Sequence, residues 1–424
     1  MRDFSFVILV GGKGERVRKI TNGLSKSEII LNKKNRIIDY QLNQISKLKK
    51  NIIFLSNIKF KKLKKNILKK YKKLNIKFIE EGKKRLGTAG SLKILSEENY
   101  KYFIIIFGDL LFNFNFKKLI NFHKKKSSDC TLVVHPNSHP KDSDCLKLND
   151  DQMLIKFYKK PHKSITPNLC LSGISIINRK VLNLINANRT QDFSKFLIPK
   201  IQKKKFKIFG YNSREYIKDV GTFSRIREAK NDLKSIKYTK GNINKKIPAI
   251  FLDRDGVINL DQNNGKYQNP DKIINKVPKA IKIINSKGFL CVLITNQPSI
   301  AKGYITLSKL KNDFISLENK LSTKGAYIDR IYFCPHHPDK GFKNEIKNLK
   351  INCNCRKPKN GLILRAIKDL NIDRKRSYFI GDRYSDYLAA KKTKLKFIYV
   401  GKYKYNNFQK KENLYKAVRY IFRK

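Results

Sequence analysis

Short runs of apolar residues, each long enough for one buried strand, recur along both halves of the chain. Polar or glycine-containing stretches end these runs, and two segments with helical patterns are Asp39–Leu48 and Pro278–Lys287. Buried strands alternating with helices predict an α/β fold. The predicted strands include Phe4–Val10, Asn51–Ser56, Tyr102–Phe107, Ala249–Leu252, Phe289–Ile294 and Tyr378–Ile380.

The border between the two halves is a change in composition. Residues 229–248 are polar and rich in lysine, and they contain a Gly-Asn pair. A length of 424 residues is enough for two or three domains that each bury a core. We therefore expect a first domain at 1–235, a linker at 236–247 and a second domain at 248–424, which gives two Rossmann-like domains in tandem.

Composition narrows the class of protein. The chain has 95 Lys and Arg against 33 Asp and Glu, a net charge of +62 that attracts phosphorylated ligands. The lysines are scattered instead of clustered, so we expect a compositional bias and no specific nucleic-acid partner. No apolar run reaches the roughly 20 residues of a membrane span. Seven cysteines without a disulfide framework suit a reducing compartment, and we expect a cytoplasmic location.

Functional side chains in the second half cluster where predicted strands end. Carboxyl ends of parallel strands meet at one edge of a sheet, where ligands bind. A carboxylate there can attack phosphorus while a second one moves protons, a lysine neutralises charge and a divalent ion holds the acids together. The four motifs are Asp253-x-Asp255-Gly256, Thr295-Asn296-Gln297, Arg356-Lys357-Pro358 and Gly381-Asp382-x-x-x-Asp386.

In this order the motifs resemble those of the haloacid dehalogenase superfamily of phosphatases, over about residues 248–401. The resemblance implies that Asp253 is the nucleophile and that Asp255 is the general acid and base. It implies that Thr295 and Lys357 bind the transferring phosphoryl group. It also implies an Mg²⁺ site made by Asp253, the backbone carbonyl of Asp255, Asp382 and Asp386.

A cysteine-rich segment lies just before the lysine motif. Cys334-x-His336 and Cys353-x-Cys355 offer three thiolates and one imidazole, the ligands of a closed tetrahedral Zn²⁺ site. We expect structural zinc that pins a substrate-facing loop. His337 stands beside His336, and spacing alone does not choose between them.

The second half looks most like the heptose 1,7-bisphosphate 7-phosphatases, whose near relatives are the histidinol-phosphate phosphatases. In the heptose enzymes the arginine after the zinc cysteines, here Arg356, helps to bind the phosphate that stays on the substrate. Asn296 and Gln297 are near enough in sequence to contribute. Histidinol phosphate remains the alternative substrate.

In the first half, a glycine-rich turn follows the first predicted strand, a second glycine-bearing turn leads into a helix, and two aspartates lie further along, one of them at the end of a predicted strand. Glycines at a strand end let a backbone approach phosphates closely, and two aspartates can hold Mg²⁺ between phosphates. The motifs are Gly11-Gly12-Lys13-Gly14-Glu15-Arg16, Lys26, Leu86-Gly87-Thr88-Ala89-Gly90, Gly108-Asp109 and Asp219-x-Gly221-Thr222.

These pieces resemble the sugar-1-phosphate nucleotidyltransferases, over about residues 3–232. The resemblance implies that Gly11, Gly12, Gly14 and Arg16 hold the triphosphate with Lys26 nearby, that Gly87 lies against the base, and that Asp109 and Asp219 bind Mg²⁺. It places Lys160 on the sugar phosphate. The chain departs from the family pattern at Glu15, Ser27 and Lys159.

The two resemblances fit one route to a nucleotide-linked heptose for a surface polysaccharide such as lipopolysaccharide. The second domain would make heptose 1-phosphate, and the first would join it to a nucleotide, with GTP favoured. One alternative is an active phosphatase with a first domain that only binds ligand. Another is a basic nucleic-acid-binding protein.

Overall fold

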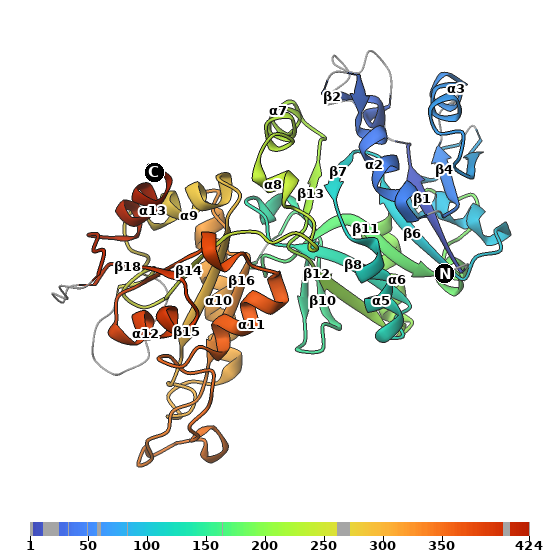
Figure 1. Cartoon of the computed structure of the whole chain (residues 1–424). Coiled ribbons are helices and arrows are strands. Elements are labelled where there is room, and N and C mark those ends of the chain that lie inside the picture. Colours follow the sequence, from blue (N-terminus) through green and yellow to red (C-terminus); the bar gives the residue numbers. More distant parts are fainter. Residues whose placement is uncertain are drawn as a thin grey trace. The chain divides into compact units, whose positions relative to one another are not determined.

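The computed structural model describes residues 3–11, 25–32, 34–48, 50–56, 61–82, 84–162, 164–260, 272–401 and 408–423. The chain forms two compact units (Figure 1). The first contains Met1–His135, Lys141–His162 and Leu169–Asn242. The second contains Pro136–Pro140, Lys163–Asn168 and Ile243–Lys424. Helix α8 (Ile236–Thr239) lies inside the range 236–247 that we expected to be a linker.

The first unit is built on a mixed nine-stranded sheet with β1 (Phe4–Leu9) near its centre. The strand order is β10-β9-β11-β6-β1-β4-β5, with β8 beside β11 and β12 beside β8. Strands β6, β1, β4 and β5 are parallel, whereas β11 is antiparallel to β6. The other bounds are β4 (Ile52–Ser56), β5 (Ile76–Glu80), β6 (Tyr102–Phe107), β8 (Cys130–His135), β9 (Cys145–Leu148), β10 (Leu154–Tyr158), β11 (Cys170–Asn178) and β12 (Ile208–Asn212).

Helices cover both faces of this sheet because successive residues of β1 point to opposite sides. Phe6 packs in the core formed with α2 (Ile37–Ile45), α3 (Lys61–Lys70) and α5 (Phe116–Lys125). Val7 packs in the opposite core, to which α6 (Ile198–Lys203) contributes. The remaining elements are β2 (Ile30–Asn32), β3 (Asn35–Arg36), the antiparallel pair β7 (Leu110–Asn113) and β13 (Tyr216–Asp219), α4 (Gly87–Gly90) and α7 (Phe223–Asp232).

The second unit has a five-stranded, all-parallel sheet in the order β16-β15-β14-β17-β18. Its first strand, β14, pairs with β15 on one side and β17 on the other, so the chain changes direction across the sheet there. Such a switch point leaves a crevice at the carboxyl ends of the strands. The bounds are β14 (Ala249–Leu252), β15 (Leu290–Asn296), β16 (Arg330–Cys334), β17 (Tyr378–Gly381) and β18 (Lys396–Tyr399).

Alternate residues of β14 again face two cores. Leu252 packs with α9 (Val277–Ser286), α10 (Leu307–Ser322) and α13 (Leu414–Arg423), whereas Phe251 packs with α11 (Gly361–Leu370) and α12 (Tyr384–Lys392). The two units confirm the expected fold class, a mixed nucleotidyltransferase-type sheet followed by a parallel one.

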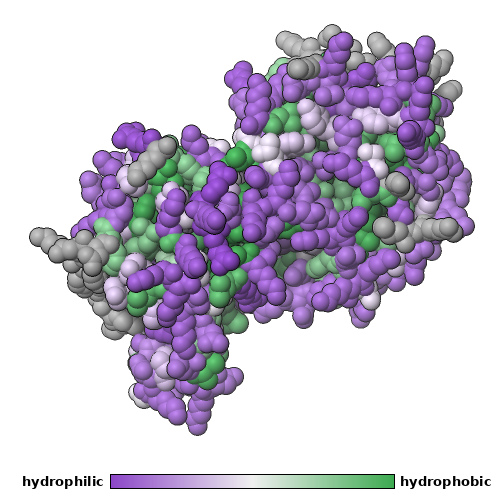
Figure 2. Space-filling view, in the orientation of Figure 1, coloured by the Kyte–Doolittle hydropathy of each residue, from purple (hydrophilic) through white to green (hydrophobic). Residues whose placement is uncertain are grey.

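Hydrophilic residues spread widely over the face shown in Figure 2. Among the helices that the structure describes, none has the length and apolar character required to cross a bilayer.

Candidate active sites

Four side chains from three separate segments of the second unit meet at the carboxyl edge of its sheet. Asp253 follows β14, and its Oδ1 lies 2.8 Å from Lys357 Nζ. The same ammonium lies 2.7 Å from Asp386 Oδ1 and donates to the Ile294 carbonyl at 3.0 Å. Burial lowers the pKa of Lys357, but its ion pairs with the two aspartates outweigh burial and raise it. One buried cation therefore serves two buried carboxylates.

A third carboxylate, Asp382, makes no ion pair with a lysine or arginine among the described residues. Ligand oxygens of Asp253, Asp382 and Asp386 all lie within 4.8 Å of one another. Burial and the two neighbouring carboxylates raise the pKa of Asp382 to about 8. Its buried Oδ1 lacks a hydrogen-bond partner among the described residues. An oxygen-rich cluster short of positive charge fits a hard divalent cation such as Mg²⁺.

The backbone leaves room for this cluster at Gly256. This residue has φ +77°, and a Cβ there would collide with the Asp382 carboxylate. Glycine is required on both counts, because other residues rarely adopt positive φ and none fits the space.

Asp255 is held in a different way. Arg254 Nε lies 2.9 Å from its Oδ1 and Arg254 Nη2 donates to its Oδ2 at 3.1 Å, which makes a two-pronged contact. Gln297 Nε2 donates to the same Oδ2 at 3.1 Å and to Thr295 Oγ1 at 2.9 Å. The carboxylate is thus fixed in orientation while part of it, 22 % of the side chain, stays exposed.

The structure gives Asn296 and Arg356 local partners. Asn296 donates to the Lys357 carbonyl at 3.1 Å and accepts from the Lys357 N–H at 3.0 Å, so it fixes the backbone of the lysine. Arg356 is half-buried and donates to the His336 carbonyl at 3.4 Å. Their contact with substrate remains a prediction.

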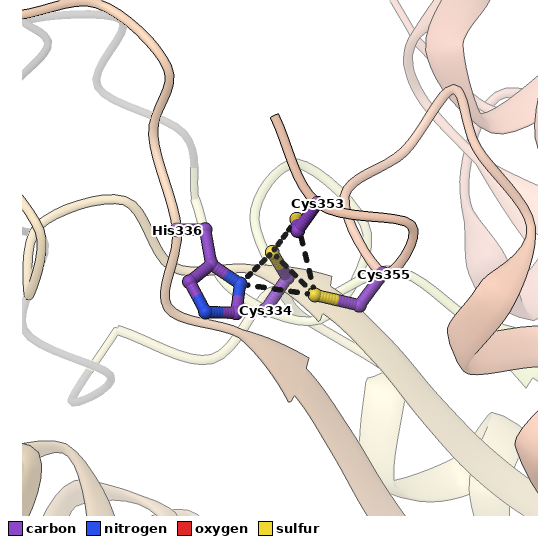
Figure 3. A group of neighbouring side chains, drawn as sticks. All are labelled: Cys334, His336, Cys353 and Cys355. Atoms are coloured by element: carbon purple, nitrogen blue, oxygen red, sulfur yellow. Dashed lines mark hydrogen bonds between the residues drawn. The ribbon is translucent and has the colours of Figure 1, made fainter. Parts of the chain in front are cut away.

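The cysteine segment forms a compact four-residue cluster (Figure 3). Cys355 Sγ lies 3.1 Å from Cys334 Sγ, 3.2 Å from Cys353 Sγ and 3.2 Å from His336 Nδ1. Four donors around one Zn²⁺ with Zn–S bonds of about 2.3 Å would stand roughly 3.5–3.8 Å apart. Contacts within the cluster run from 3.1 to 3.6 Å, at or below these separations, so the four donors surround one point and could hold a tetrahedral metal after moving slightly apart. His337 instead lies 3.7 Å from Asp339, so the geometry selects His336.

In the first unit, a cavity of about 230 Å³ lies at the carboxyl edge of the sheet. Lys26 Nζ reaches Asp109 Oδ2 at 3.0 Å, and Gly11 and Gly87 also line the cavity. Gly87 has φ +74°, and a Cβ there would stand 2.5 Å from the Gln191 carbonyl oxygen. Gly12, Gly14 and Arg16 lie outside the described residues.

The second predicted metal ligand of this unit is close in the fold to the first. The Val220 N–H donates to the Asp109 carbonyl at 3.0 Å, which brings Asp219 beside it. The Asp219 carboxylate pairs with Arg225 of α7.

Lys160 is exposed, and its Nζ donates to the Asp142 carbonyl at 3.1 Å. It is not among the residues that line the described cavity.

Comparison with known proteins now places the chain. The model of the nucleotidyl transferase family matches residues 5–236, and that of the HAD-hydrolase-like family matches residues 354–419. D-glycero-β-D-manno-heptose-1,7-bisphosphate 7-phosphatase of Haemophilus ducreyi is 41% identical over 143 residues, 34% of this chain and 76% of that protein. The chain belongs to both the nucleotidyl transferase and the heptose bisphosphate phosphatase families.

A second phosphatase of the same name, from Pasteurella multocida, is 39% identical over 35% of this chain and 78% of its own length. Among solved structures, HddC from Yersinia pseudotuberculosis is 22% identical, with a TM-score of 0.46, over 54% of this chain and 99% of that one.

Two roles in this member of the phosphatase family were missed from sequence. Arg254, only 2% exposed, orients Asp255, although it occupies the unspecified position x of the Asp253-x-Asp255 motif. Asp386 both caps α12, by accepting from the Arg383 N–H at 3.1 Å, and pairs with Lys357. The capping role had a signal, because an acid three residues after the N-cap residue, here Arg383, favours such a contact.

Proposed function

We propose that the second unit removes the 7-phosphate of D-glycero-D-manno-heptose 1,7-bisphosphate through an aspartyl phosphate. The observation that carries this is the meeting of Asp253, Lys357, Asp382 and Asp386 at one sheet edge. The substrate follows from the relatives, which are named for this activity.

In the first step a carboxylate oxygen of Asp253 attacks phosphorus, and the bond from phosphorus to the sugar oxygen breaks. Asp255, oriented by Arg254 and Gln297, gives its proton to the leaving oxygen. Lys357 neutralises charge on the phosphoryl oxygens. Water then attacks the phosphorus of the acyl phosphate, and Asp255 takes the proton that the water loses. The bond from phosphorus to the Asp253 oxygen breaks, which releases inorganic phosphate and restores the carboxylate.

Mg²⁺ held by Asp253, Asp382, Asp386 and the backbone carbonyl of Asp255 would supply charge neutralisation between the acids and the phosphate.

Zn²⁺ on Cys334, His336, Cys353 and Cys355 would have a structural role, since protein ligands would fill all four of its coordination positions. Selective zinc chelation should lower the melting temperature and reduce the fraction of the second unit that is folded. An unchanged melting curve after verified metal loss would remove this role.

For the first unit the function best supported is transfer of a nucleotidyl group from a nucleoside triphosphate, with GTP preferred, to the heptose 1-phosphate that the phosphatase makes. The cavity with Lys26, Asp109, Gly11 and Gly87 supports it. The products would be an NDP-heptose and pyrophosphate.

Two rate measurements on the full chain test these activities. Phosphate release from heptose 1,7-bisphosphate should be faster than release from histidinol phosphate. The reverse order would show that histidinol phosphate is the preferred substrate. Pyrophosphate release with heptose 1-phosphate and each nucleoside triphosphate tests the first unit. Turnover with none of them would leave it a ligand-binding domain.

A further inference from the structure

The second unit contains two short segments from the first half of the chain. Pro136–Pro140 and Lys163–Asn168 belong to it, whereas the residues between them, Lys141–His162, belong to the first unit. Lys160, which we predict on the sugar phosphate, lies near the end of this intervening stretch. The chain therefore passes from one unit to the other on both sides of the stretch that carries Lys160.

The two segments are joined by their asparagines. Asn168 Nδ2 donates to the Asn137 carbonyl at 2.8 Å, and the Asn137 N–H donates to Asn168 Oδ1 at 3.0 Å. Asn168 is only 3% exposed, and its side chain uses both its donor and its acceptor in this pair. A buried amide satisfied in this way fixes the backbone of one segment against that of the other.

Helix α10 holds the second segment through two consecutive residues. Asn319 Nδ2 donates to the Thr166 carbonyl, and also to the Ile315 carbonyl of its own helix at 2.8 Å. The Asn168 N–H donates to the Glu318 carboxyl group, and burial, which outweighs this hydrogen bond, raises the pKa of the carboxyl to about 8. Neither Asn319 nor Glu318 belongs to a motif from which the two activities were inferred.

The loop that carries Lys160 is tied within the first unit. The Lys160 N–H donates to Asp144 Oδ1 at 3.0 Å, and His162 Nε2 donates to the Ser143 carbonyl at 2.7 Å. Thr166 is only six residues beyond Lys160, a stretch that spans at most about 20 Å when fully extended. Because the stretch is short, the anchoring of Thr166 limits where the lysine can lie.

We propose that Asn319 and Glu318 of α10 position the loop that carries Lys160 for the binding of heptose 1-phosphate. Binding residues on loops depend on a rigid scaffold to place them, and here part of that scaffold belongs to the second unit. The unit that makes the sugar phosphate thereby also orders the loop that receives it. This inference rests on the proposed transferase function and on the predicted role of Lys160, and it names two positioning residues for that function.

Pyrophosphate release by the full chain, with GTP as the nucleotide, tests the inference through the KM of each substrate. Asn319→Ala should raise the KM for heptose 1-phosphate about 5-fold, the effect of one hydrogen bond, and change kcat and the KM for GTP by less than about 2-fold. Glu318→Ala should have a similar effect. Glu318→Gln should keep the wild-type KM, because its amide oxygen can still accept from the Asn168 N–H.

Asn312→Ala is the matched control, because Asn312 is an exposed asparagine of the same helix. It should change neither KM. The double variant Lys160→Ala/Asn319→Ala separates positioning from general damage. If α10 acts through Lys160, the double variant should have the same KM for heptose 1-phosphate as Lys160→Ala alone, because residues that act through one another are not additive.

Amide hydrogen exchange reports on the loop without any turnover. The Lys160 N–H is bonded to Asp144, so its exchange measures how firmly the loop is held. In Asn319→Ala this amide should exchange about 5-fold faster than in the wild type, whereas Asn312→Ala should leave its rate unchanged.

An unchanged KM for heptose 1-phosphate in Asn319→Ala and Glu318→Ala, an equal rise in the KM for GTP, or additive effects in the double variant would overturn the inference. If the wild type turns over no nucleotide, the transferase function falls, and hydrogen exchange decides whether α10 positions the loop. If Asn319→Ala does not fold, the comparison of Glu318→Ala with Glu318→Gln decides instead.

Discussion

The two active-site edges balance their acids differently. In the second unit one buried lysine pairs with Asp253 and Asp386, and Asp382 is the acid that we expect a metal to neutralise. In the first unit each predicted metal ligand already has its own cation, Lys26 for Asp109 and Arg225 for Asp219. The phosphatase edge has three carboxylates and one lysine, so it is short of two positive charges, which a divalent cation would supply. On the edge of the first unit, the predicted metal ligands would have to exchange their ion pairs when triphosphate and metal bind. We therefore expect the phosphatase edge to be preorganised and the nucleotidyl transferase edge to be rearranged by its substrate.

The largest effect expected from this comparison is loss of the nucleophile. Asp253→Asn should lower the phosphatase kcat by about 10⁴-fold or more, because an amide cannot form the acyl phosphate. Pyrophosphate release by the first unit should keep its wild-type rate. Full phosphatase activity in this variant would show that another group attacks phosphorus.

The shared lysine should matter for folding as well as for chemistry. Lys357→Met leaves two buried carboxylates without a cation and should lower the free energy of unfolding by about 3–5 kcal/mol in denaturant titrations without added Mg²⁺. Lys359→Met is the control, because that lysine lies two residues away, is only half-buried and donates to the Asn352 amide instead of a carboxylate. It should change stability by less than about 1 kcal/mol. Equal losses in the two variants would contradict the preorganised charge balance.

In the first unit, Asp109→Asn should lower the rate of nucleotidyl transfer by about 100-fold, because the carboxylate would no longer help to hold the metal. It should also free Lys26 from its ion pair, so nucleotide binding measured without metal should be kept or strengthened. Phosphatase rates serve as the internal control. Weaker metal-free nucleotide binding would show that the Lys26–Asp109 pair shapes the site instead of competing with substrate.

Much of the phosphatase edge could be predicted because its functional residues follow strands that are easily recognised in the sequence as runs of apolar residues. Parallel strands deliver their ends to one edge, so the separated motifs around Asp253, Thr295 and Asp382 had to meet. Strand β15 nevertheless runs through Asn296, two residues beyond the predicted end at Ile294. Helix α2 starts two residues earlier than Asp39, whose carboxylate accepts from the Arg36 N–H at 2.8 Å. Backbone pairing with β16 extends the strand, and the Asp39 cap accompanies the earlier start of the helix; the pattern of apolar residues reports neither.

What the sequence left open depended on three-dimensional neighbours. Spacing allowed His336 or His337 in the metal cluster, and only the turn after β16 decides which imidazole faces Cys355. The phosphate loop's Gly12, Gly14 and Arg16 lie outside the described residues, so their roles stay predictions.

The smallest effect expected concerns Lys160, which we predicted on the sugar phosphate. In the structure its ammonium donates to the Asp142 carbonyl, and its N–H donates to Asp144 Oδ1 at 3.0 Å. Lys160→Ala should raise the KM for heptose 1-phosphate by about 10-fold and change kcat by less than about 3-fold, since an exposed charge contributes one hydrogen bond to the phosphate. Lys156→Ala, at an exposed position of β10, should change neither. An unaltered KM would leave Lys160 as a lysine that only ties its loop to Asp142. The nucleotidyl transferase edge would then bind the sugar phosphate through other residues. A raised KM would instead show that the Lys160 ammonium leaves the Asp142 carbonyl to bind phosphate, as we expect Lys26 to leave Asp109.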